Sequence, residues 1–309
     1  MEKKIIAHFI HWWKEYFYSK KSCYNSFESL LKRYGIEIEC FYDAKNKISD
    51  TNQDILFYSV FGNMKQENMN KYKNTYKIFY TGENKPLDKN ADLNLTFTDT
   101  NQYNNIRFPV WILNLITNIP FKDDNAFFDK NYFKDLSKLT LTPKENTEFC
   151  CFIYSNKKQD RINIFNILSK YKKIDSPGSC MNNHACIGYT IQGKVKFQKK
   201  YKFCIAFENS SNDGYTTEKI LHAYLCNCIP IYWGNKNVHL DFNKETMICV
   251  HDFKSFEDAV EYIKKVDNDE ELYKKYMNKP IFSNTWIERF SDPEEKFFRN
   301  VVNKIINKK

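Results

Sequence analysis

Two neighbouring charged residues, Glu218 and Lys219, open a stretch of helical spacing that follows a strand-like run and a short polar loop. A cation in the first turn of a helix faces the positive end of the helix dipole and is unfavourable there unless an anion lies nearby. A diphosphate would supply that anion and would also accept the free backbone N–H groups of the turn. Glu218 is suited to accept hydrogen bonds from ribose hydroxyls, as acidic residues do in dinucleotide-binding folds. On position alone, a solvated lysine and a glutamate that favours the helix start explain the pair equally well.

The surrounding segment, residues 202–234, reads KFCIAFENSSNDGYTTEKILHAYLCNCIPIYWG. It contains a strand that ends in FEN, a loop, a Y-x-TEK helix start and a strand of P-x-Y-x-G type, and in this order it resembles the central motif of the α-1,3-fucosyltransferases. The matching residues are Phe207, Glu208, Asn209, Tyr215, Thr217, Glu218, Lys219, Pro230, Tyr232 and Gly234. The resemblance implies that Tyr215, Glu218 and Lys219 contact GDP-fucose. Glu208 and Asn209 are further candidates for this donor site.

A second segment, YSNKKQDRINIFNIL from Tyr154, is similar to the strand, loop and arginine-led helix of the same family. Arg161 matches the arginine that the family is expected to place on the donor phosphates. A planar fork of donors suits a diphosphate better than a point charge does. Ser155 and Asn156, in the loop before it, are weaker candidates for the donor site. Without the motif, an arginine on a linker surface would be the favoured interpretation.

A third segment, IFYTGEN at residues 78–84, resembles the family segment whose glutamate is regarded as the general base, and that position is Glu83. An acceptor hydroxyl must lose a proton as it attacks the anomeric carbon, so the chemistry needs such a group. A lone glutamate in a turn is more often solvated, and only the surrounding motif reverses this expectation. RFPVWILN from Arg107 resembles the Arg-x-Pro strand of the family, and KIIAHFIHWW from Lys4 resembles its first strand and paired tryptophans.

Strand-length apolar runs bounded by polar residues recur through the first half and predict a buried sheet. The predicted strands are KIIAHFI from Lys4, IEIECFY from Ile36, DILFYSVF from Asp54, YKIFYTGE from Tyr76, DLNLTFT from Asp92 and FPVWILNLI from Phe108. Residues 24–34 fit a crossover helix. The first half is therefore predicted to be α/β.

The alternation restarts after a polar segment, residues 121–148, which is the best candidate for a linker. Strands are predicted from Phe149, Phe203 and Ile229, and helices from Arg161 and Tyr215. Parallel strands are expected for such a second βαβ domain.

Two more helices are predicted near the end of the chain. Ser255 and Asp258 form a capping-box-like start to the first, whose apolar side is Ala259, Val260, Ile263 and Val266. Asp292 followed by Pro293 starts the second, whose apolar stripe is Phe297, Phe298, Val301, Val302 and Ile305. A basic amphipathic helix can make peripheral membrane contact. Packing against the protein body is the commoner use of such a helix.

Composition is that of a globular protein long enough for two domains, with 309 residues of which 42% are hydrophobic and 28% charged. The net charge of +9 suits anionic partners such as nucleotides. The lysines are scattered and no nucleic-acid-binding signature is present, so nucleic acid is not a predicted partner. Several of the ten cysteines lie in apolar runs such as FCCFIY, where a thiol acts as a small hydrophobe. With no secretory signal in MEKKIIAHFIHWWKEY and no run of membrane-spanning length, reduced thiols and a cytoplasmic location are predicted, with peripheral membrane contact as an option.

Metal sites are poorly supported by the sequence. Cys180, His184 and Cys186 offer three ligands with no spaced partner pair, which favours an accidental cluster in a loop. Asp267-Asn268-Asp269 resembles the metal-binding triplet of another glycosyltransferase fold, but it lies between two predicted helices and is better explained as a cap. Arg161 and Lys219 make a catalytic metal unnecessary, so no metal and no cofactor beyond GDP-fucose as co-substrate is predicted.

The family resemblance covers most of the chain, densely over residues 149–253, and implies a GT-B fold: two Rossmann-like domains that face each other across a cleft. Residues 1–145 would bind the acceptor and carry Glu83, and residues 146–309 would bind GDP-fucose, with packing of the last helix back on the N-terminal domain as an option. The predicted reaction is inverting transfer of fucose from GDP-β-L-fucose to a hydroxyl, O3 of GlcNAc or glucose in a lactose- or N-acetyllactosamine-type glycan. Two alternatives stay open: a GT-B transferase for another nucleotide sugar, and a non-catalytic glycan- or nucleic-acid-binding protein on the same fold.

Overall fold

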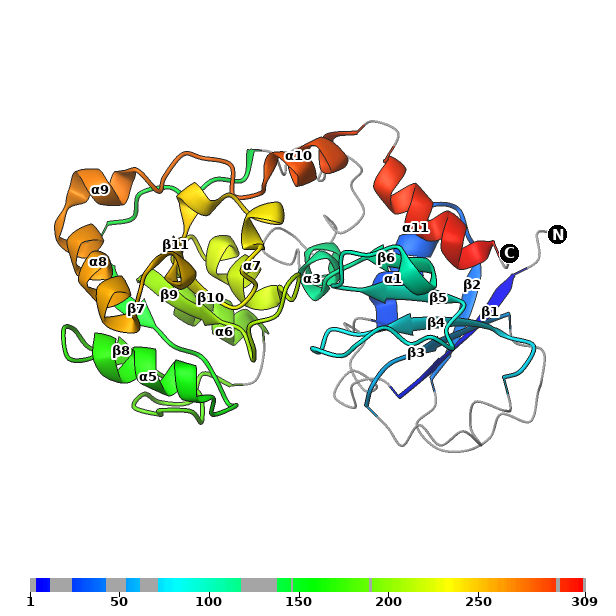
Figure 1. Cartoon of the computed structure of the whole chain (residues 1–309), viewed down its shortest axis with the longest axis horizontal. Coiled ribbons are helices and arrows are strands. Elements are labelled where there is room, and N and C mark those ends of the chain that lie inside the picture. Colours follow the sequence, from blue (N-terminus) through cyan, green and yellow to red (C-terminus); the bar gives the residue numbers. More distant parts are fainter. Residues whose placement is uncertain are drawn as a thin grey trace. The chain divides into compact units, whose positions relative to one another are not determined.

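The computed structural model of the chain, drawn in Figure 1, describes residues 4–11, 24–42, 54–61, 72–117, 138–145, 147–188, 191–292 and 295–307. It divides into two compact units. Unit 1 contains Met1–Tyr132 together with Asp292–Lys309, and unit 2 contains Phe133–Ser291. The chain therefore leaves unit 1 once, and its last segment returns there.

Unit 1 is built around a parallel sheet that, within the described residues, has the strand order β2-β1-β3-β4-β5-β6. Its strands are β1 (Ile5–Ile10), β2 (Ile38–Tyr42), β3 (Ile55–Tyr58), β4 (Tyr76–Tyr80), β5 (Leu93–Thr96) and β6 (Asn105–Arg107). Neighbouring strands of this sheet are parallel, and β3 is buried along its whole length. Strands buried on both faces explain why the sequence shows continuous apolar runs instead of alternation.

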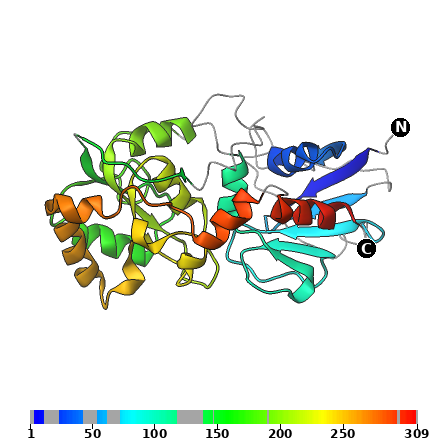
Figure 2. The same cartoon turned by 90° about the horizontal axis from the view of Figure 1, so that it is seen from above.

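Unit 1 also contains helices α1 (Tyr24–Arg33), α3 (Val110–Thr117) and α11 (Lys296–Ile306). The apolar stripe of α11 is buried at Phe298, Val301, Val302 and Ile305, as predicted. Glu295, just before α11, pairs with Arg33 at the end of α1 and accepts a hydrogen bond from the Tyr34 hydroxyl at 2.6 Å. The two helices can be followed in blue and dark red in Figure 2. The apolar stripe of α11 is thus used for packing within unit 1. Peripheral membrane contact through α11 stays a prediction.

Unit 2 contains a second parallel sheet, with the order β11-β10-β9-β7-β8 in the described residues. Its strands are β7 (Glu148–Cys151), β8 (Ile174–Asp175), β9 (Tyr201–Phe207), β10 (Ile229–Trp233) and β11 (Ile248–Cys249). Cys150, Cys151 and Cys204 are buried in β7 and β9, so the prediction that these thiols serve as small core residues is confirmed.

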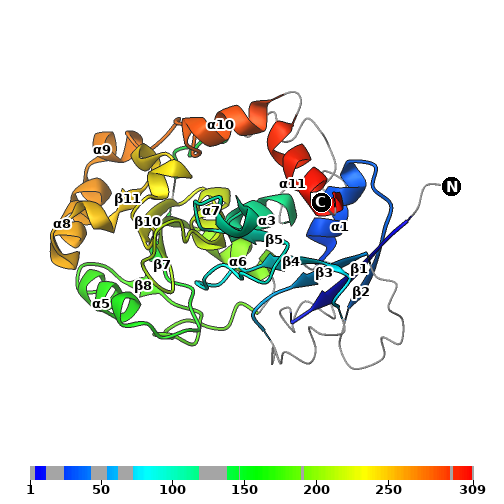
Figure 3. The ribbon, with the colours of Figure 1, turned by 45° about the vertical axis from the view of Figure 1, so that its right-hand side comes forward.

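Helices cover both faces of the second sheet. Figure 1 and Figure 3 show α5 (Gln159–Leu168) and α8 (Phe256–Asn268) on one side of the strands, with α6 (Ile191–Gln198) and α7 (Glu218–Leu225) on the other. Ser255 caps α8 by accepting a hydrogen bond from the Asp258 N–H at 3.1 Å, and all four residues of its predicted apolar side are buried. The unit also contains α9 (Glu270–Lys274), α10 (Asn284–Ser291) and short 3-10 turns at Val238–Leu240, Lys244–Thr246 and Val250–Asp252.

One predicted strand is wrong. The run FPVWILNLI from Phe108 forms helix α3 from Val110, and the strand is the short β6, which ends at Arg107. A short apolar run does not distinguish a buried strand from a buried helix, and Pro109 immediately before Val110 is typical of a helix start. The predicted paired tryptophans, Trp12 and Trp13, and residues 121–137 of the predicted linker lie outside the described residues.

Candidate active site

The candidate donor residues of unit 2 follow the carboxyl ends of two neighbouring strands. The chain passes from β7 to β8 on one side and then crosses to β9 on the other, so the strand order reverses between β7 and β9. Ligands of doubly wound sheets bind outside the carboxyl ends of the strands at such a switch point. Ser155 and Asn156 come after β7, and Glu208 and Asn209 come directly after β9.

Glu208 is fully buried, with 0% of its surface exposed, and it fixes the start of α7. Its carboxylate accepts the Thr217 N–H at 2.7 Å and the Thr217 hydroxyl at 2.6 Å. Thr217 is the N-cap of α7 but makes no cap bond with its own side chain; its hydroxyl donates to Glu208 and accepts from Lys219 Nζ at 2.9 Å. Burial raises the pKa of Glu208, and the nearby charge of Lys219 offsets only part of that rise.

Lys219 lies in the first turn of α7, as predicted, and carboxylates of the protein itself neutralise it. Its Nζ is 3.3 Å from Glu208 Oε2 and 3.6 Å from Glu218 Oε1. Burial disfavours the charged ammonium, but Glu218 and Glu208 outweigh it and raise the pKa of Lys219. Burial likewise acts to raise the pKa of Glu218, but the surrounding cations, Lys219 foremost, lower it to about 2. A diphosphate at this turn would therefore share Lys219 with two carboxylates.

Arg161 is the third residue of α5, and its side chain is buried, with 1% exposure. It donates to the Phe207 carbonyl and to Asn209 Oδ1, each at 2.8 Å, and to the Asn156 carbonyl at 3.2 Å. Its guanidinium also lies 4.0 Å from the centre of the Tyr154 ring. These contacts exclude an arginine on a linker surface. Within the described residues Nε of Arg161 is buried and has no hydrogen-bond partner.

The structure thus joins most of the predicted donor residues into one chain of contacts. It runs from Asn156 through Arg161 to Asn209, passes along the backbone to Glu208, and continues through contacts to Thr217, Lys219 and Glu218. Ser155, next to Asn156 in sequence, is exposed, and its carbonyl accepts a hydrogen bond from the Ser179 hydroxyl at 3.2 Å. Tyr215 is 2% exposed and lies inside the loop before α7. Contact of these residues with a donor stays a prediction.

Sequence reasoning missed Asn235, which organises the same loop from the neighbouring strand. Its side chain is 0% exposed and accepts the Gly214 N–H at 2.8 Å. It also donates to Thr216 Oγ1 at 3.0 Å. An asparagine directly after the P-x-Y-x-G strand was the available signal, because this residue type commonly bonds to nearby backbone.

Glu83, the predicted base, belongs to unit 1 and follows the carboxyl end of β4. Its N–H donates to Thr81 Oγ1 at 3.0 Å, and its carbonyl accepts the Lys85 N–H at 2.8 Å. These bonds fix the backbone of the turn. Among the residues that the structure describes, no side chain pairs with the Glu83 carboxylate. A partly exposed carboxylate without a fixed partner is available to accept a proton, and its role as base stays a prediction.

Metal-ligand geometry is not found in the described part of the chain, where no group of three or more His, Cys, Asp or Glu residues could hold an ion. Cys180 is buried while Cys186 is exposed. Asp269 accepts the Leu272 N–H at 3.0 Å, which confirms the predicted cap at the start of α9. Asp267 instead pairs with Lys172 and Lys202.

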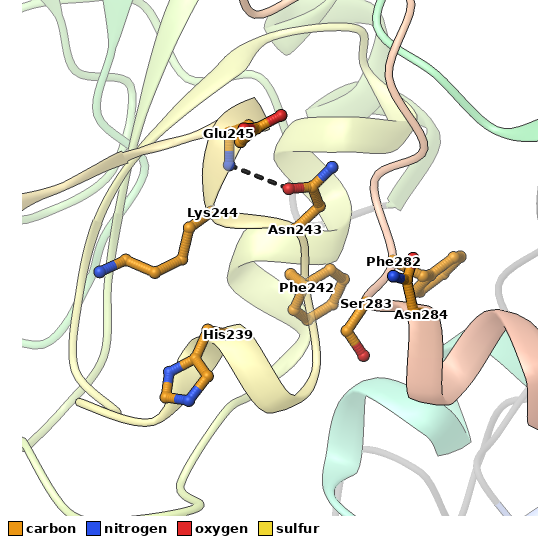
Figure 4. A pocket seen from close by; sticks show the side chains of 8 residues that line it. All are labelled: His239, Phe242, Asn243, Lys244, Glu245, Phe282, Ser283 and Asn284. Atoms are coloured by element: carbon orange, nitrogen blue, oxygen red, sulfur yellow. Dashed lines mark hydrogen bonds between the residues drawn. The ribbon is translucent and has the colours of Figure 1, made fainter.

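Unit 2 also has a hollow of about 690 Å³, shown in Figure 4. It is lined by His239, Phe242, Asn243, Lys244, Glu245, Phe282, Ser283 and Asn284. The candidate donor residues are not among them. Asn243 accepts the Glu245 N–H at 3.0 Å and donates to the Pro280 carbonyl at 3.0 Å, so it fixes this region much as Asn235 fixes the loop before α7.

The two parallel sheets match solved structures over nearly the whole chain. A crystal structure of an α1,3-fucosyltransferase with GDP-fucose is similar with a TM-score of 0.68 and 24% identity, covering 98% of this chain and 92% of that one. A second crystal structure of an α1,3-fucosyltransferase has a TM-score of 0.69 at 23% identity, covering 97% and 90%. The fold is therefore of the GT-B glycosyltransferase class.

Family models place the chain more narrowly. Residues 8–114 match the N-terminal domain of the α-(1,3)-fucosyltransferase FucT, and residues 143–294 match the C-terminal part of glycosyltransferase family 10 (fucosyltransferase). The chain belongs to this fucosyltransferase family.

Two curated relatives show how far the similarity extends. α-(1,3)-Fucosyltransferase FucT of Helicobacter pylori is 31% identical over 267 residues, which is 79% of this chain and 53% of that protein. A putative fucosyltransferase of Acanthamoeba polyphaga mimivirus is 37% identical over 150 residues, 46% of this chain and 25% of that protein. The chain thus spans between a quarter and about half the length of these relatives. In the described residues, no helix combines the length and apolar character needed to cross a membrane.

Proposed function

We propose that the chain transfers fucose from GDP-fucose to a hydroxyl group of a glycan. The chain of contacts from Asn156 to Glu218 at the switch point of the unit 2 sheet carries this proposal. It gathers two cations, Arg161 and Lys219, beside an acidic residue at a helix start, which suits a diphosphate attached to a ribose. Membership of the fucosyltransferase family supports GDP-fucose as the donor.

The proposed reaction is a single inverting displacement. The acceptor oxygen bonds to the anomeric carbon as the bond from that carbon to the diphosphate oxygen breaks, which turns a β-linked donor into an α-linked product. Glu83 takes the proton of the acceptor hydroxyl. Arg161 and Lys219 stabilise the charge that develops on GDP.

The proposal also identifies the acceptor and the parts of the protein that bind each substrate. Residues 1–145 bind the acceptor and supply Glu83, and the part of residues 146–309 that belongs to unit 2 binds GDP-fucose through Arg161, Tyr215, Glu218 and Lys219. The acceptor is a lactose- or N-acetyllactosamine-type glycan modified at O3 of glucose or GlcNAc. GDP-fucose is the only co-substrate.

Product analysis tests the activity. The protein is incubated with GDP-fucose and a panel of lactose- and N-acetyllactosamine-type acceptors, and mass spectrometry with NMR identifies any fucosylated product and its linkage. Parallel reactions contain GDP-mannose or UDP-galactose in place of GDP-fucose. Fucosylated product with GDP-fucose alone supports the proposal, and transfer only from another nucleotide sugar would replace it.

Nucleotide binding is tested by thermal unfolding. GDP and GDP-fucose should raise the melting temperature because they bind the folded state, and UDP and CMP should raise it much less. Equal shifts with all of these nucleotides would contradict a guanine-specific site.

A further inference from the structure

We propose that Asn235 is a positioning residue for donor binding, which holds residues 214–217 in the binding conformation before the nucleotide arrives. The inference rests on the proposed function and deepens it. Asn235 comes from the end of β10, whereas the residues expected to touch the donor follow β9 and open α7. Its effect on the donor would therefore be indirect.

The side chain of Asn235 makes three hydrogen bonds, two of them into the loop. Oδ1 accepts the Gly214 N–H at 2.8 Å and the Asn237 N–H at 2.9 Å. Nδ2 donates to Thr216 Oγ1 at 3.0 Å. The backbone N–H of Asn235 donates to the Tyr232 hydroxyl at 3.0 Å, which fixes the position of Asn235 relative to β10. The side-chain amide thus connects the end of β10 to the loop before α7.

Because the Asn235 side chain is buried, its hydrogen bonds to the loop depend on its amide group. Asn235 is 0% exposed and Thr216 is 1% exposed, so water cannot replace the lost bonds if the side chain is removed. A buried polar group left without its partner costs far more than an average hydrogen bond contributes. The Gly214 N–H and the Thr216 hydroxyl would lose these bonds, and the loop would adopt other conformations.

The loop is fixed at further points, all close to the donor candidates. Glu208 holds Thr217, and the Ser211 hydroxyl donates to the Gly234 carbonyl at 2.6 Å. Asn235 anchors the stretch between these two points, immediately before Glu218 and Lys219. If the stretch is loose, binding must order it, and that cost is taken from the affinity for the nucleotide. Once the donor is bound, the same geometry is restored.

The test uses Asn235→Ala with Asn243→Ala as matched control, because Asn243 is a bonded asparagine of unit 2 beside the hollow in Figure 4. Calorimetry measures the Kd for GDP, and kinetics measure KM and kcat for GDP-fucose. We expect Asn235→Ala to raise the Kd and the donor KM about tenfold or more while kcat at saturating donor stays within about twofold. The control should lower the melting temperature without changing either constant.

A second, milder variant guards against a failure to fold. Thr216→Val keeps the shape of the side chain and removes one of the three bonds, so it should raise the donor KM by a smaller factor. Hydrogen exchange of residues 209–217, measured without nucleotide, should be faster in both loop variants than in wild type and should slow again with GDP.

The outcomes separate the two proposals. A folded Asn235→Ala protein with wild-type Kd for GDP, or with unchanged hydrogen exchange in the loop, overturns the positioning role while the proposed function stands. A wild-type protein that neither binds GDP nor transfers fucose overturns the proposed function and the inference with it.

Discussion

Lys219 neutralises a buried carboxylate, and the proposed function requires it to bind a phosphate as well. These two roles affect different measurements. Glu208 is fully buried, so removing its cation leaves an uncompensated charge, which typically costs roughly 3 kcal/mol or more. The role in nucleotide binding does not depend on that charge being present. A pair of variants can therefore separate stability from binding.

Lys219→Met should lower both the free energy of unfolding and the affinity for GDP. Adding Glu208→Gln to Lys219→Met should restore part of the stability, because the unpaired charge is gone, but it should not restore the affinity. Urea unfolding and calorimetry with GDP measure the two effects. If the double variant binds GDP like wild type, Lys219 does not contact the diphosphate.

Glu83→Gln addresses the base directly. Glutamine keeps the size of the side chain but cannot take the proton, so turnover should fall by roughly 10²-fold or more. Donor affinity should hardly change, since the donor candidates all belong to unit 2. The comparison is kcat against the Kd for GDP, with the melting temperature as a check on folding. Near wild-type turnover would remove Glu83 from the mechanism and make Glu208 the next carboxylate to test.

His222, in helix α7, makes the stability of the protein depend on pH. It is a buried residue of α7, with Nδ1 3.0 Å from Lys194 Nζ, and burial together with that charge lowers its pKa from 6.5 to about 3. Below pH 6.5 the unfolded chain binds a proton that the folded chain does not, so this residue reduces stability as the pH falls toward 3. His222→Gln should therefore lose less melting temperature than wild type between pH 7.5 and 4.5. His239→Gln, at an exposed histidine, is the control and should behave like wild type.

The ends of β9 and β10 approach each other closely. A Cβ on Gly234 would lie 2.4 Å from Glu208 Cγ, so only glycine lets the end of β10 pack against the residue after β9. Gly234→Ala should cost roughly 1–3 kcal/mol of stability and weaken GDP binding, because Glu208 must move. Gly35→Ala is a useful comparison, since that glycine has positive φ but open space around it. If both variants lose the same stability and neither changes GDP binding, the packing of Gly234 on Glu208 has no role in the site.

The sequence predicted the elements best where packing dictates the pattern. β1, β2, β3, β4, β5 and β10 fall within the predicted strand regions, and β7 and β9 begin one and two residues before theirs, because parallel strands buried on both faces need continuous apolar runs. The cap at Ser255 and the buried side of α8 were also predictable, since a polar cap followed by helical spacing is a local signal. The FPVWILNLI run was not, because a fully buried helix and a buried strand share that composition.

The candidate site was predictable only as a set of residues. Motif and charge identified Arg161, Glu208, Glu218 and Lys219, but not that the carboxylates pair with Lys219 in the protein itself. The pair of Glu208 and Lys219 joins residues eleven positions apart through the turn geometry, which no periodicity in the sequence indicates. Asn235 was missed for the same reason: its partners at Gly214 and Thr216 are about twenty residues away in sequence.

At the scale of the whole molecule, the proposed chemistry requires no metal ion. Arg161 and Lys219 supply the positive charge that a divalent cation would otherwise bring to the leaving diphosphate. Fucose transfer should therefore continue after dialysis against EDTA. Rates measured with EDTA, with added Mg²⁺ and with added Mn²⁺ should agree within about twofold. Complete loss in EDTA that only a divalent ion reverses would mean that the leaving group is stabilised in another way.

The return of α11 to unit 1 has a consequence for how the chain is made. Unit 2 is one continuous stretch, so all of its residues are synthesised before α11. Unit 1 has by then emerged first but lacks the helix that buries Phe298, Val301 and Val302 and that brings Glu295 to Arg33. Its apolar surface stays uncovered for the time needed to synthesise the intervening residues. The unit that begins synthesis first is thus the one that completes its core last, and in that interval it is the part of the nascent protein most dependent on chaperones.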